Sequence, residues 1–379
     1  MKPSARYASI DILRGILMVL MALDHAMLFI ARQHSPGEYW GGSFPSYSSA
    51  LPFITRAITH LCAPGFFFLM GTGMALFAIS RSRSGWSYIR ITSHFIGRGL
   101  LLIILEFTII AWGWQLAPGG WVLKQYFGVM AALGSTMVIT SIIAGLLSLP
   151  SRRKALAIAA TVLGCLLPVL ANLSMPSIND WNKIQPMLSR LFLVPGGDLN
   201  FWLQYPILPW LGLVFLGLAF GVLMYHNKSL AYRIIAISGA LFLVLFIAIR
   251  GLNGFGNLRP RSGASWIDWL NVVKYPPELA FTLLTLGIDM LLLAGIGWLI
   301  EKNQTCKSCK YLTLPFKQFG QTPLFFYVVH LYLYASIGHL LSPWVTTLPQ
   351  TYMFCLVGLL ILYPLCYGYQ WLASYRVKQ

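Results

Sequence analysis

The sequence predicts an all-α integral membrane protein, a polytopic bundle of about ten spanning helices. Hydrophobic residues make up 57% of the 379 residues, charged residues make up only 10%, and the mean hydropathy is +0.69. Soluble domains carry about 25% charged residues. The apolar runs extend unbroken over about 20 residues, which suits a spanning helix, whereas the strands of a membrane barrel alternate over about ten. A soluble fold and a barrel are therefore excluded.

Ten segments are long and apolar enough to be counted as spans. At a rise of about 1.5 Å per residue, each can cross a hydrocarbon core about 30 Å thick. We expect them to form a single transmembrane domain covering residues 1–379. The expected spans are residues 9–31, 51–79, 93–115, 126–149, 155–173, 206–225, 232–249, 277–300, 318–341 and 352–372.

Positive charge is concentrated on one side of these spans. Lysine and arginine gather in the cytoplasmic loops of membrane proteins, so the formal net charge of +17 mainly reports orientation. Both termini are predicted in the cytoplasm, without a cleaved signal peptide. No basic soluble domain is visible, so no nucleic-acid partner is expected. The residues on the predicted cytoplasmic side are Lys2, Arg6, Arg81, Arg83, Arg90, Arg152, Arg153, Lys154, Lys228, Lys302, Lys307, Lys310, Lys317, Arg376 and Lys378.

The longer connections between spans are expected outside the cytoplasm. They cover residues 32–50, 174–205 and 250–276 and are rich in Gly, Pro, Asn, Trp and Tyr. Aromatic rings beside hydrogen-bonding groups suit the face of a sugar, although Trp and Tyr also anchor helices at membrane interfaces. Among the residues in or next to these connections, we expect His34, Trp210 and Tyr275 to contact the substrate.

The first two expected spans carry ionisable residues where a spanning helix is normally apolar. Such groups are costly in a bilayer, so they usually face a bundle interior or a wet cavity and mark a functional site. Four lie in the first span and two in the second. They are Asp11, Arg14, Asp24 and His25, followed by Arg56 and His60.

Four of these side chains are expected to meet in the outer half of the membrane. Arg56 and His60 lie one turn apart on one helix face, and Pro64 leaves the carbonyl of His60 without its helical donor, which predicts a kink. The two spans are antiparallel neighbours, so the rise per residue brings Asp24 and His25 to a similar depth. A catalytic cluster is the leading interpretation, and a structural polar contact between two helices is the alternative.

Two further groups are candidates for contacts with reactants. Tyr327 and His330 share one helix stripe, where a hydrogen-bonded core histidine is the alternative to a substrate contact. Five arginines near the cytoplasmic side can bind phosphates through charge-assisted bonds, although on spacing alone ordinary positive-inside enrichment is the stronger explanation. These are Arg14, Arg81, Arg83, Arg90 and Arg98. The single CxxC motif, Cys306 with Cys309, supplies only two of the four ligands of a structural zinc site, so no metal is expected.

Five ordered blocks of the sequence are RYASIDILRGILMVLMALDH, TRAITHLCAPGFFFLMGTG, YPILPWLGLVFLGLAFG, KYPPELAFTLLTLG and FGQTPLFFYVVHLYL. These blocks resemble bacterial transmembrane acyltransferases related to heparan-alpha-glucosaminide N-acetyltransferase, which are proteins of the bacterial inner membrane. They are spread from residue 6 to about residue 340, so the resemblance covers nearly the whole chain. The resemblance implies an enzyme that takes acetyl from cytosolic acetyl-CoA, as co-substrate, and delivers it to a glycan acceptor across the membrane.

The resemblance leaves the catalytic histidine open. The animal lysosomal relative is described as using a His in the loop after its first span, together with an Asn near the end of that helix. Here His25 occupies what looks like the Asn position, and His34 lies near the loop position but offset. The bacterial branch instead carries the pair Asp24–His25 and the block with His60. The base is therefore His25, His60 or His34.

We expect His25 to act as a general base toward an amine or hydroxyl of the acceptor. Imidazole has an ordinary pKa of about 6.5, which suits proton abstraction near neutral pH. Asp24 or Arg56 would orient His25, and His60 or Arg56 would stabilise the oxyanion. The phosphates of the donor would lie near Arg81, Arg83, Arg90 or Arg98. An acetyl-His intermediate is the two-step variant.

Two other functions remain open at this stage. A proton-coupled transporter or flippase of a glycan or lipid-linked substrate would use the same buried groups as a proton relay. A nonenzymatic assembly scaffold is the other. Membrane lipid, acyl-CoA and a sugar or glycan are the expected partners, and the assembly is open between a monomer and a homodimer.

Overall fold

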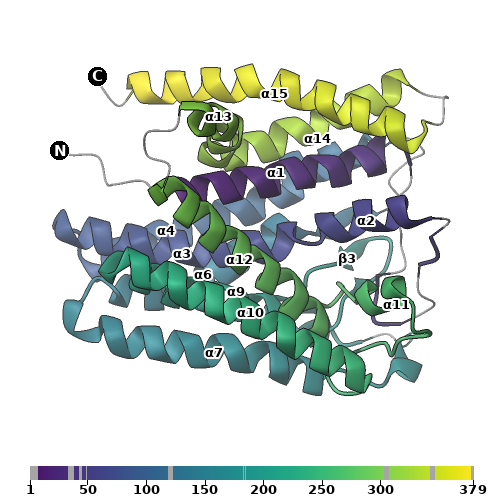
Figure 1. The fold of residues 1–379 in the computed structure, drawn as a ribbon, viewed down its shortest axis with the longest axis horizontal. Helices are drawn as coiled ribbons and strands as arrows, with labels where there is room; N and C mark the ends of the chain where they lie inside the picture. The colour runs from purple at the N-terminus through teal and green to yellow at the C-terminus, as the bar shows by residue number, and fades with distance from the viewer. Residues whose placement is uncertain are drawn as a thin grey trace.

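The computed structural model describes residues 7–32, 38–41, 45–47, 49–117, 123–181, 183, 185–302, 307–341 and 346–376, of which residues 307–310 and 376 are described by their backbone alone. Ten helices in this part of the chain are long and apolar enough to cross a membrane, which confirms the predicted all-α bundle. They lie side by side along the horizontal axis of Figure 1. We call the end where the first helix begins, at Ala8, the proximal end, and the opposite end the distal end.

The elements follow the chain in one order, and two of the spans are interrupted. The second span consists of α2 and α3, and the third consists of α4, a π-helical turn and α5. The bounds are α1 (Ala8–Phe29), α2 (Ala50–Thr59), α3 (Cys62–Arg83), α4 (Tyr88–Leu105), a π turn (Glu106–Ile110), α5 (Ala111–Gln115), β1 (Gln125–Phe127), α6 (Val129–Leu146), a 3-10 turn (Pro150–Arg152), α7 (Arg153–Leu173), a 3-10 turn (Ile178–Asp180), α8 (Met187–Phe192), β2 (Gly196–Gly197), β3 (Phe201–Leu203), α9 (Ile207–His226), α10 (Lys228–Leu252), α11 (Trp266–Leu270), α12 (Leu279–Lys302), α13 (Lys307–Gln321), α14 (Pro323–Leu340) and α15 (Leu348–Arg376).

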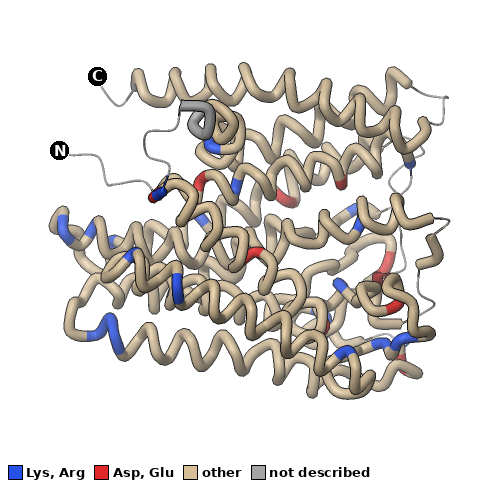
Figure 2. Tube along the Cα trace, in the orientation of Figure 1, with Lys and Arg blue, Asp and Glu red and all other residues tan. Residues whose placement is uncertain are grey.

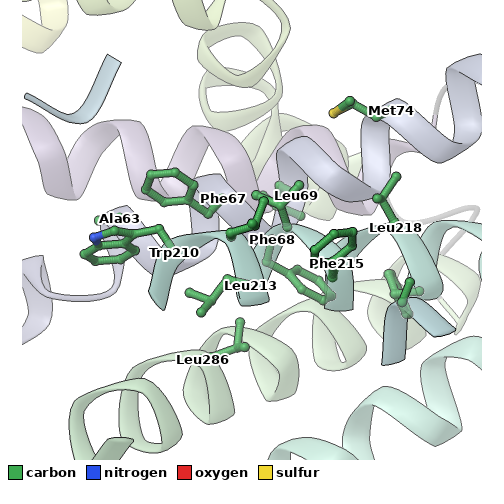
Figure 3. Close-up of a cluster of buried hydrophobic side chains, with 14 of the residues drawn as sticks. Ala63, Phe67, Phe68, Leu69, Met74, Trp210, Leu213, Phe215, Leu218 and Leu286 are labelled. Carbon is green, nitrogen blue, oxygen red and sulfur yellow. The ribbon is translucent and has the colours of Figure 1, made fainter. Parts of the chain in front are cut away.

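The core of the bundle is built where α3 packs along α9 (Figure 3). The ring of Phe67 stacks on that of Trp210 with centroids 4.9 Å apart. Glycines bring the two backbones close, because a Cβ at Gly217 would lie 2.0 Å from the carbonyl oxygen of Phe68, and one at Gly71 would lie 2.1 Å from a carbonyl oxygen of α9. Small residues at such contacts are typical of helix packing in membranes. Trp210, expected to contact substrate, is thus fully buried in this core.

The second span is interrupted where the sequence predicts a kink. α2 ends at Thr59, α3 begins at Cys62, and the N–H of Gly65 donates to the carbonyl of Leu61 at 3.1 Å. Pro64 has no N–H with which to extend the helix across this point. The irregularity is confirmed, and it places His60 at the break rather than inside a continuous helix.

Two short β arrangements organise the distal end. β1 pairs in parallel with β3, and β2 pairs with β3 in the antiparallel sense. In a second ladder, the N–H of Tyr275 donates to the carbonyl of Glu38 at 3.0 Å, and the N–H of Trp40 donates to the carbonyl of Tyr275 at 3.0 Å. The loop after α1 is therefore fixed to the segment that precedes α12.

At the proximal end, α13 crosses α1 at very close range and is seen nearly end-on in Figure 1. A Cβ at Gly15 would lie 1.7 Å from the carbonyl oxygen of Phe316, and one at Gly320 would lie 1.8 Å from that of Asp11. The side chain of Gln321 donates to Asp11 Oδ2 at 3.1 Å. Most of α13 therefore lies in residues 301–317, which no expected span covers, and this helix packs on the start of α1.

Charge is distributed unequally between the two ends (Figure 2). The proximal end is mainly basic, with Arg81, Arg83, Arg90, Lys154 and Lys228 at or next to helix ends there. The distal end holds both signs. Its acidic residues include Glu38, Asp180, Asp198, Asp268 and Glu278.

Candidate functional site

His25 of α1 and His330 of α14 form a hydrogen-bonded pair. The distance between Nδ1 of His25 and Nε2 of His330 is 2.7 Å, and the rings are stacked with centroids 4.9 Å apart. Nδ1 of His330 lies 2.9 Å from the carbonyl oxygen of Phe326. A carbonyl can only accept, so Nδ1 of His330 carries the proton, and its Nε2 accepts from Nδ1 of a neutral His25. That tautomer puts the lone pair of His25 on Nε2.

Aromatic side chains enclose this pair. The ring centroid of His25 lies 5.2 Å from that of Trp114, 6.3 Å from that of Phe29 and 6.5 Å from that of Tyr327. His25 is 8% exposed and His330 is fully buried. An imidazole packed in this way is held in one orientation, with little access for water. Trp114 belongs to α5, the helical segment that follows the π turn in the third span.

The other polar side chains of the first two spans form a separate network centred on Arg56. Its guanidinium pairs with Asp24 of α1 and with both carboxylate oxygens of Glu38, and the Nε–Oε1 distance to Glu38 is 2.5 Å. His60 Nε2 lies 2.9 Å from Glu38 Oε1. The hydroxyl of Thr59 donates to Asp24 at 3.0 Å. Three of the four side chains expected in one cluster therefore meet here, while His25 lies against His330.

Glu38 is buried in this network and belongs to the loop after α1, not to a span. It is 2% exposed. Burial favours the neutral acid, but Arg56 and His60 outweigh burial and hold the pKa of Glu38 well below its ordinary value. The ladder with residues 274 and 275 supplies the backbone support that carries Glu38 to this depth.

Lys274 is a second buried charge at the distal side of the network. It is 4% exposed, and its Nζ lies 5.2 Å from the ring centroid of Tyr275. Burial disfavours the ammonium, but Tyr275, Asp24 and Glu38 hold the pKa of Lys274 above its ordinary value. The site therefore combines two buried cations, Arg56 and Lys274, with the buried carboxylate of Glu38 and the partly buried carboxylate of Asp24.

Aromatic and amide side chains gather at the distal end, in and beside the segments that hold Glu38 and Lys274. The indole N–H of Trp202 donates to Gln204 Oε1 at 2.8 Å, the hydroxyl of Tyr39 donates to the same oxygen, and the hydroxyls of Tyr205 and Tyr275 are 3.3 Å apart. Burial raises the pKa of the Tyr39 phenol, so it stays protonated. These groups come from three of the distal loops. Rings with fixed hydrogen-bonding groups can hold a sugar, and Tyr275, expected from the sequence to contact the substrate, lies among them.

Two adjoining cavities lie between the basic proximal end and the histidine pair. One has a volume of about 370 Å³ and the other about 320 Å³, and Arg14 and Gly73 line both. The first is bordered by Arg81 and Arg83. The second is lined at one end by Arg98 and reaches Tyr327, whose ring lies 5.5 Å from that of His330.

The five arginines predicted to bind phosphate are not equivalent. Arg90 stacks on the indole of Trp86, 4.2 Å from the ring centroid, and lies outside the lining of both cavities. Arg14 donates to Asp11 at 3.2 Å and to the carbonyl of Gly320 at 2.9 Å, so it also ties α13 to the cavity mouth. The other three line one cavity each.

Comparison with known proteins identifies the family of this chain. A family profile described as heparan-alpha-glucosaminide N-acetyltransferase, catalytic, matches residues 6–252. The chain belongs to this family. The match confirms the resemblance and includes α1 to α10, whereas His330 on α14 lies beyond it.

Two curated members of the family, both named heparan-alpha-glucosaminide N-acetyltransferase, match part of the chain. The human protein is 27% identical over 145 residues, which are 38% of this chain and 20% of that protein. The mouse protein is 26% identical over 138 residues, 36% of this chain and 19% of that protein. The match thus spans about a fifth of the length of these relatives.

Three residues of the site are not predicted by the sequence patterns, namely Glu38, Lys274 and Trp114. Glu38 has a visible signal, as an acid among the aromatics of GEYWGG in a chain with ten acids. Lys274 is the first residue of the KYPPE block and shows no local anomaly, and Trp114 looks like an ordinary interfacial ring. His34 lies outside the described residues. Among those residues, no group of three or more His, Cys, Asp or Glu side chains is arranged to hold a metal ion.

Proposed function

We propose that the protein transfers acetyl from acetyl-CoA, bound from the proximal end, to an amine or hydroxyl of an amino sugar or glycan bound at the distal end. The observation that carries this proposal is the pair of cavities that begins among arginines and ends at Tyr327, beside the pair His25–His330. Family membership supports acetyl transfer as the reaction class. The position of the cavities supports entry of the donor from the proximal end.

The lining of the two cavities fits the two halves of this donor. Arg81 and Arg83 border the outer cavity, where charge-assisted hydrogen bonds would hold the phosphates. The inner cavity is mostly apolar, with Met18, Leu69 and Met70 in its wall, and would hold the extended arm that carries the thioester. Acetyl-CoA supplies the activated acyl carbon, and the protein positions it.

His25 is the proposed base. Its Nε2 lone pair accepts the proton of the attacking amine or hydroxyl as the new bond to the acyl carbon forms. The C–S bond then breaks, and the proton returns from His25 to the leaving sulfur, so that the products are the acetylated acceptor and a thiol. His330 accepts a hydrogen bond from Nδ1 of His25 throughout, which orients the ring and stabilises its charged form, as the third member of a catalytic triad does.

Arg56 is assigned a positioning role. Both carboxylates of the network accept from its guanidinium, so its donors are engaged within the protein. Arg56 therefore fixes the distal end of α1, where Asp24 precedes His25 in the chain. His60, bonded to Glu38, extends the same support to the break between α2 and α3.

The acceptor side is proposed to be the distal end, where Tyr39, Trp202, Gln204 and Tyr275 gather. The names of the relatives specify a glucosaminide, and rings with fixed amide and phenol groups suit an amino sugar or related glycan. The basic proximal end supports the orientation with both termini in the cytoplasm of a bacterial inner membrane, because positive charge is enriched on that side.

The experiment is a sidedness assay in proteoliposomes of known protein orientation. Acetyl-CoA is supplied only to the proximal face, glucosamine-terminated acceptors only to the distal face, and the product is identified by mass. The proposal expects acetylated acceptor on the distal face and thiol release on the proximal face. Transfer that needs both reactants on one face would contradict the path through the cavities, and absence of transfer with folded protein and a broad acceptor panel would contradict the reaction.

A further inference from the structure

A third cavity of about 520 Å³ lies away from the proposed site, among α7, α9 and α10. Its wall is apolar, with Ala157, Leu216, Ala219 and Met290 among the lining residues. Ile158 of this wall is 56% exposed, so the cavity is a groove on the lipid-facing flank of the bundle.

Glycine contacts close this groove at its distal end. A Cβ at Gly164 of α7 would lie 3.0 Å from the carbonyl oxygen of Gly212 of α9, and one at Gly239 of α10 would lie 2.8 Å from that of Gly287 of α12. At these points the backbones are in close contact. The lining residues of α7, α9 and α10 all lie on the proximal side of these contacts, within residues 154–161, 216–226 and 234–238.

The length of the groove matches one leaflet of a bilayer. From His226, the last residue of α9, to Leu216 is ten residues, or about 15 Å of helix. The hydrocarbon core of a bilayer is about 30 Å thick, so the groove runs from the membrane surface to about its midplane. An occupant of this shape is a hydrocarbon chain rather than a compact solute.

The proximal mouth of the groove carries the charge that identifies the head group. Lys154, the second residue of α7, and His226 line this end. The neighbouring Lys228 pairs with Glu301 at 3.1 Å, so its charge is already matched. Lysine near a membrane surface attracts anionic lipid.

We propose that this groove is a binding site for an anionic phospholipid, with an acyl chain along α9 and the phosphate against Lys154 and His226. Lipid binding requires no step of acetyl transfer, so this proposal can be tested independently of the proposed reaction.

The test is native mass spectrometry of the full chain in mild detergent, titrated with dioleoyl phosphatidylglycerol or dioleoyl phosphatidylcholine. The wild type is expected to retain one phosphatidylglycerol in preference to phosphatidylcholine. Lys154→Gln is expected to lower that preference about fivefold, which is the fold-change for about 1 kcal/mol per lysine. Arg152→Gln, a neighbouring exposed cation outside the lining, is the matched control and keeps the preference.

A second pair of variants tests the groove itself. Ala157→Phe fills the wall and is expected to remove the retained lipid, whereas Ala159→Phe, on an exposed position outside the lining, keeps it. Equal retention of the two lipids by the wild type would overturn the proposal. So would equal retention by the two phenylalanine variants. If Ala157→Phe fails to fold, the comparison of Lys154→Gln with Arg152→Gln decides alone, and equal preferences in that pair overturn the proposal.

Discussion

Nδ1 of His25 lies 2.7 Å from Nε2 of His330, although the two residues are 305 positions apart in the chain. The contact joins the first spanning helix to the ninth. Since His330 also donates to its own helix backbone, the pair has a defined direction of hydrogen bonding. This direction makes the roles of the two histidines separately testable.

Replacing His330 is expected to reduce catalysis without removing the base. His330→Ala leaves Nδ1 of His25 without its acceptor, and the rate of transfer is expected to fall about 10²-fold. His330→Gln retains an acceptor oxygen and is expected to recover part of the loss. Both variants should change kcat with little effect on the KM of the donor. A larger effect on the donor KM than on kcat would place His330 in donor binding instead.

Gly73 lies where the two proximal cavities meet, and a Cβ there would contact nothing within 4 Å. Gly73→Leu should therefore fold normally and obstruct the passage, raising the KM for acetyl-CoA at least tenfold. Gly97→Leu is the matched control, because a Cβ at Gly97 also contacts nothing within 4 Å and the residue lines neither cavity. Unchanged donor kinetics in Gly73→Leu would mean that the donor takes another route.

Glu38 is predicted to be important for stability as well as for the site. Glu38→Gln removes one of the two carboxylates around Arg56, and loss of one partner of a buried ion pair costs roughly 3–5 kcal/mol. Glu301→Gln is the control, since the Glu301–Lys228 pair is partly exposed and such pairs contribute about 1 kcal/mol or less. Thermal unfolding in detergent compares the two. A similar loss in both variants would contradict the structural role given to Glu38.

Glu278 predicts a pH dependence of stability. Burial raises its pKa to about 7, against the opposing effects of Arg250 and of the backbone N–H groups of Val273 and Leu258. The folded protein thus holds this proton more tightly than the unfolded chain. The stabilisation is complete below the ordinary pKa of about 4.5 and is lost as the pH rises through about 7. The melting temperature should fall by a few degrees between pH 5 and pH 8, and this slope should flatten in Glu278→Gln. An unchanged slope in the variant would assign it to another group.

Local patterns in the sequence predict the spans and the part of the site that lies on single helices. Long apolar runs fix the number of crossings, and helical spacing puts Arg56 and His60 on one face, where the structure joins them through Glu38. Pro64 predicts the break in the second span because its effect on the backbone is local.

The remaining features depend on how distant segments pack. The approach of α14 to α1, which pairs His330 with His25, leaves no trace in either helix alone. Glu38 reaches the network because a ladder with residues 274 and 275 carries its loop inward. The close contact of α13 with α1 depends on Gly15 and Gly320, and each of them packs against a residue far away in the chain. Hydropathy and spacing describe single segments, so they cannot predict such pairings.

The most direct test of the account is the rate of acetyl transfer from acetyl-CoA to a glucosamine-terminated acceptor by His25→Ala. The references are the wild type and His339→Ala, measured at equal folded fraction, because His339 is exposed and lines neither cavity. The account predicts a loss of about 10²–10⁴-fold in His25→Ala alone, with donor binding retained. Transfer by His25→Ala within a few-fold of the wild type would contradict His25 as the base.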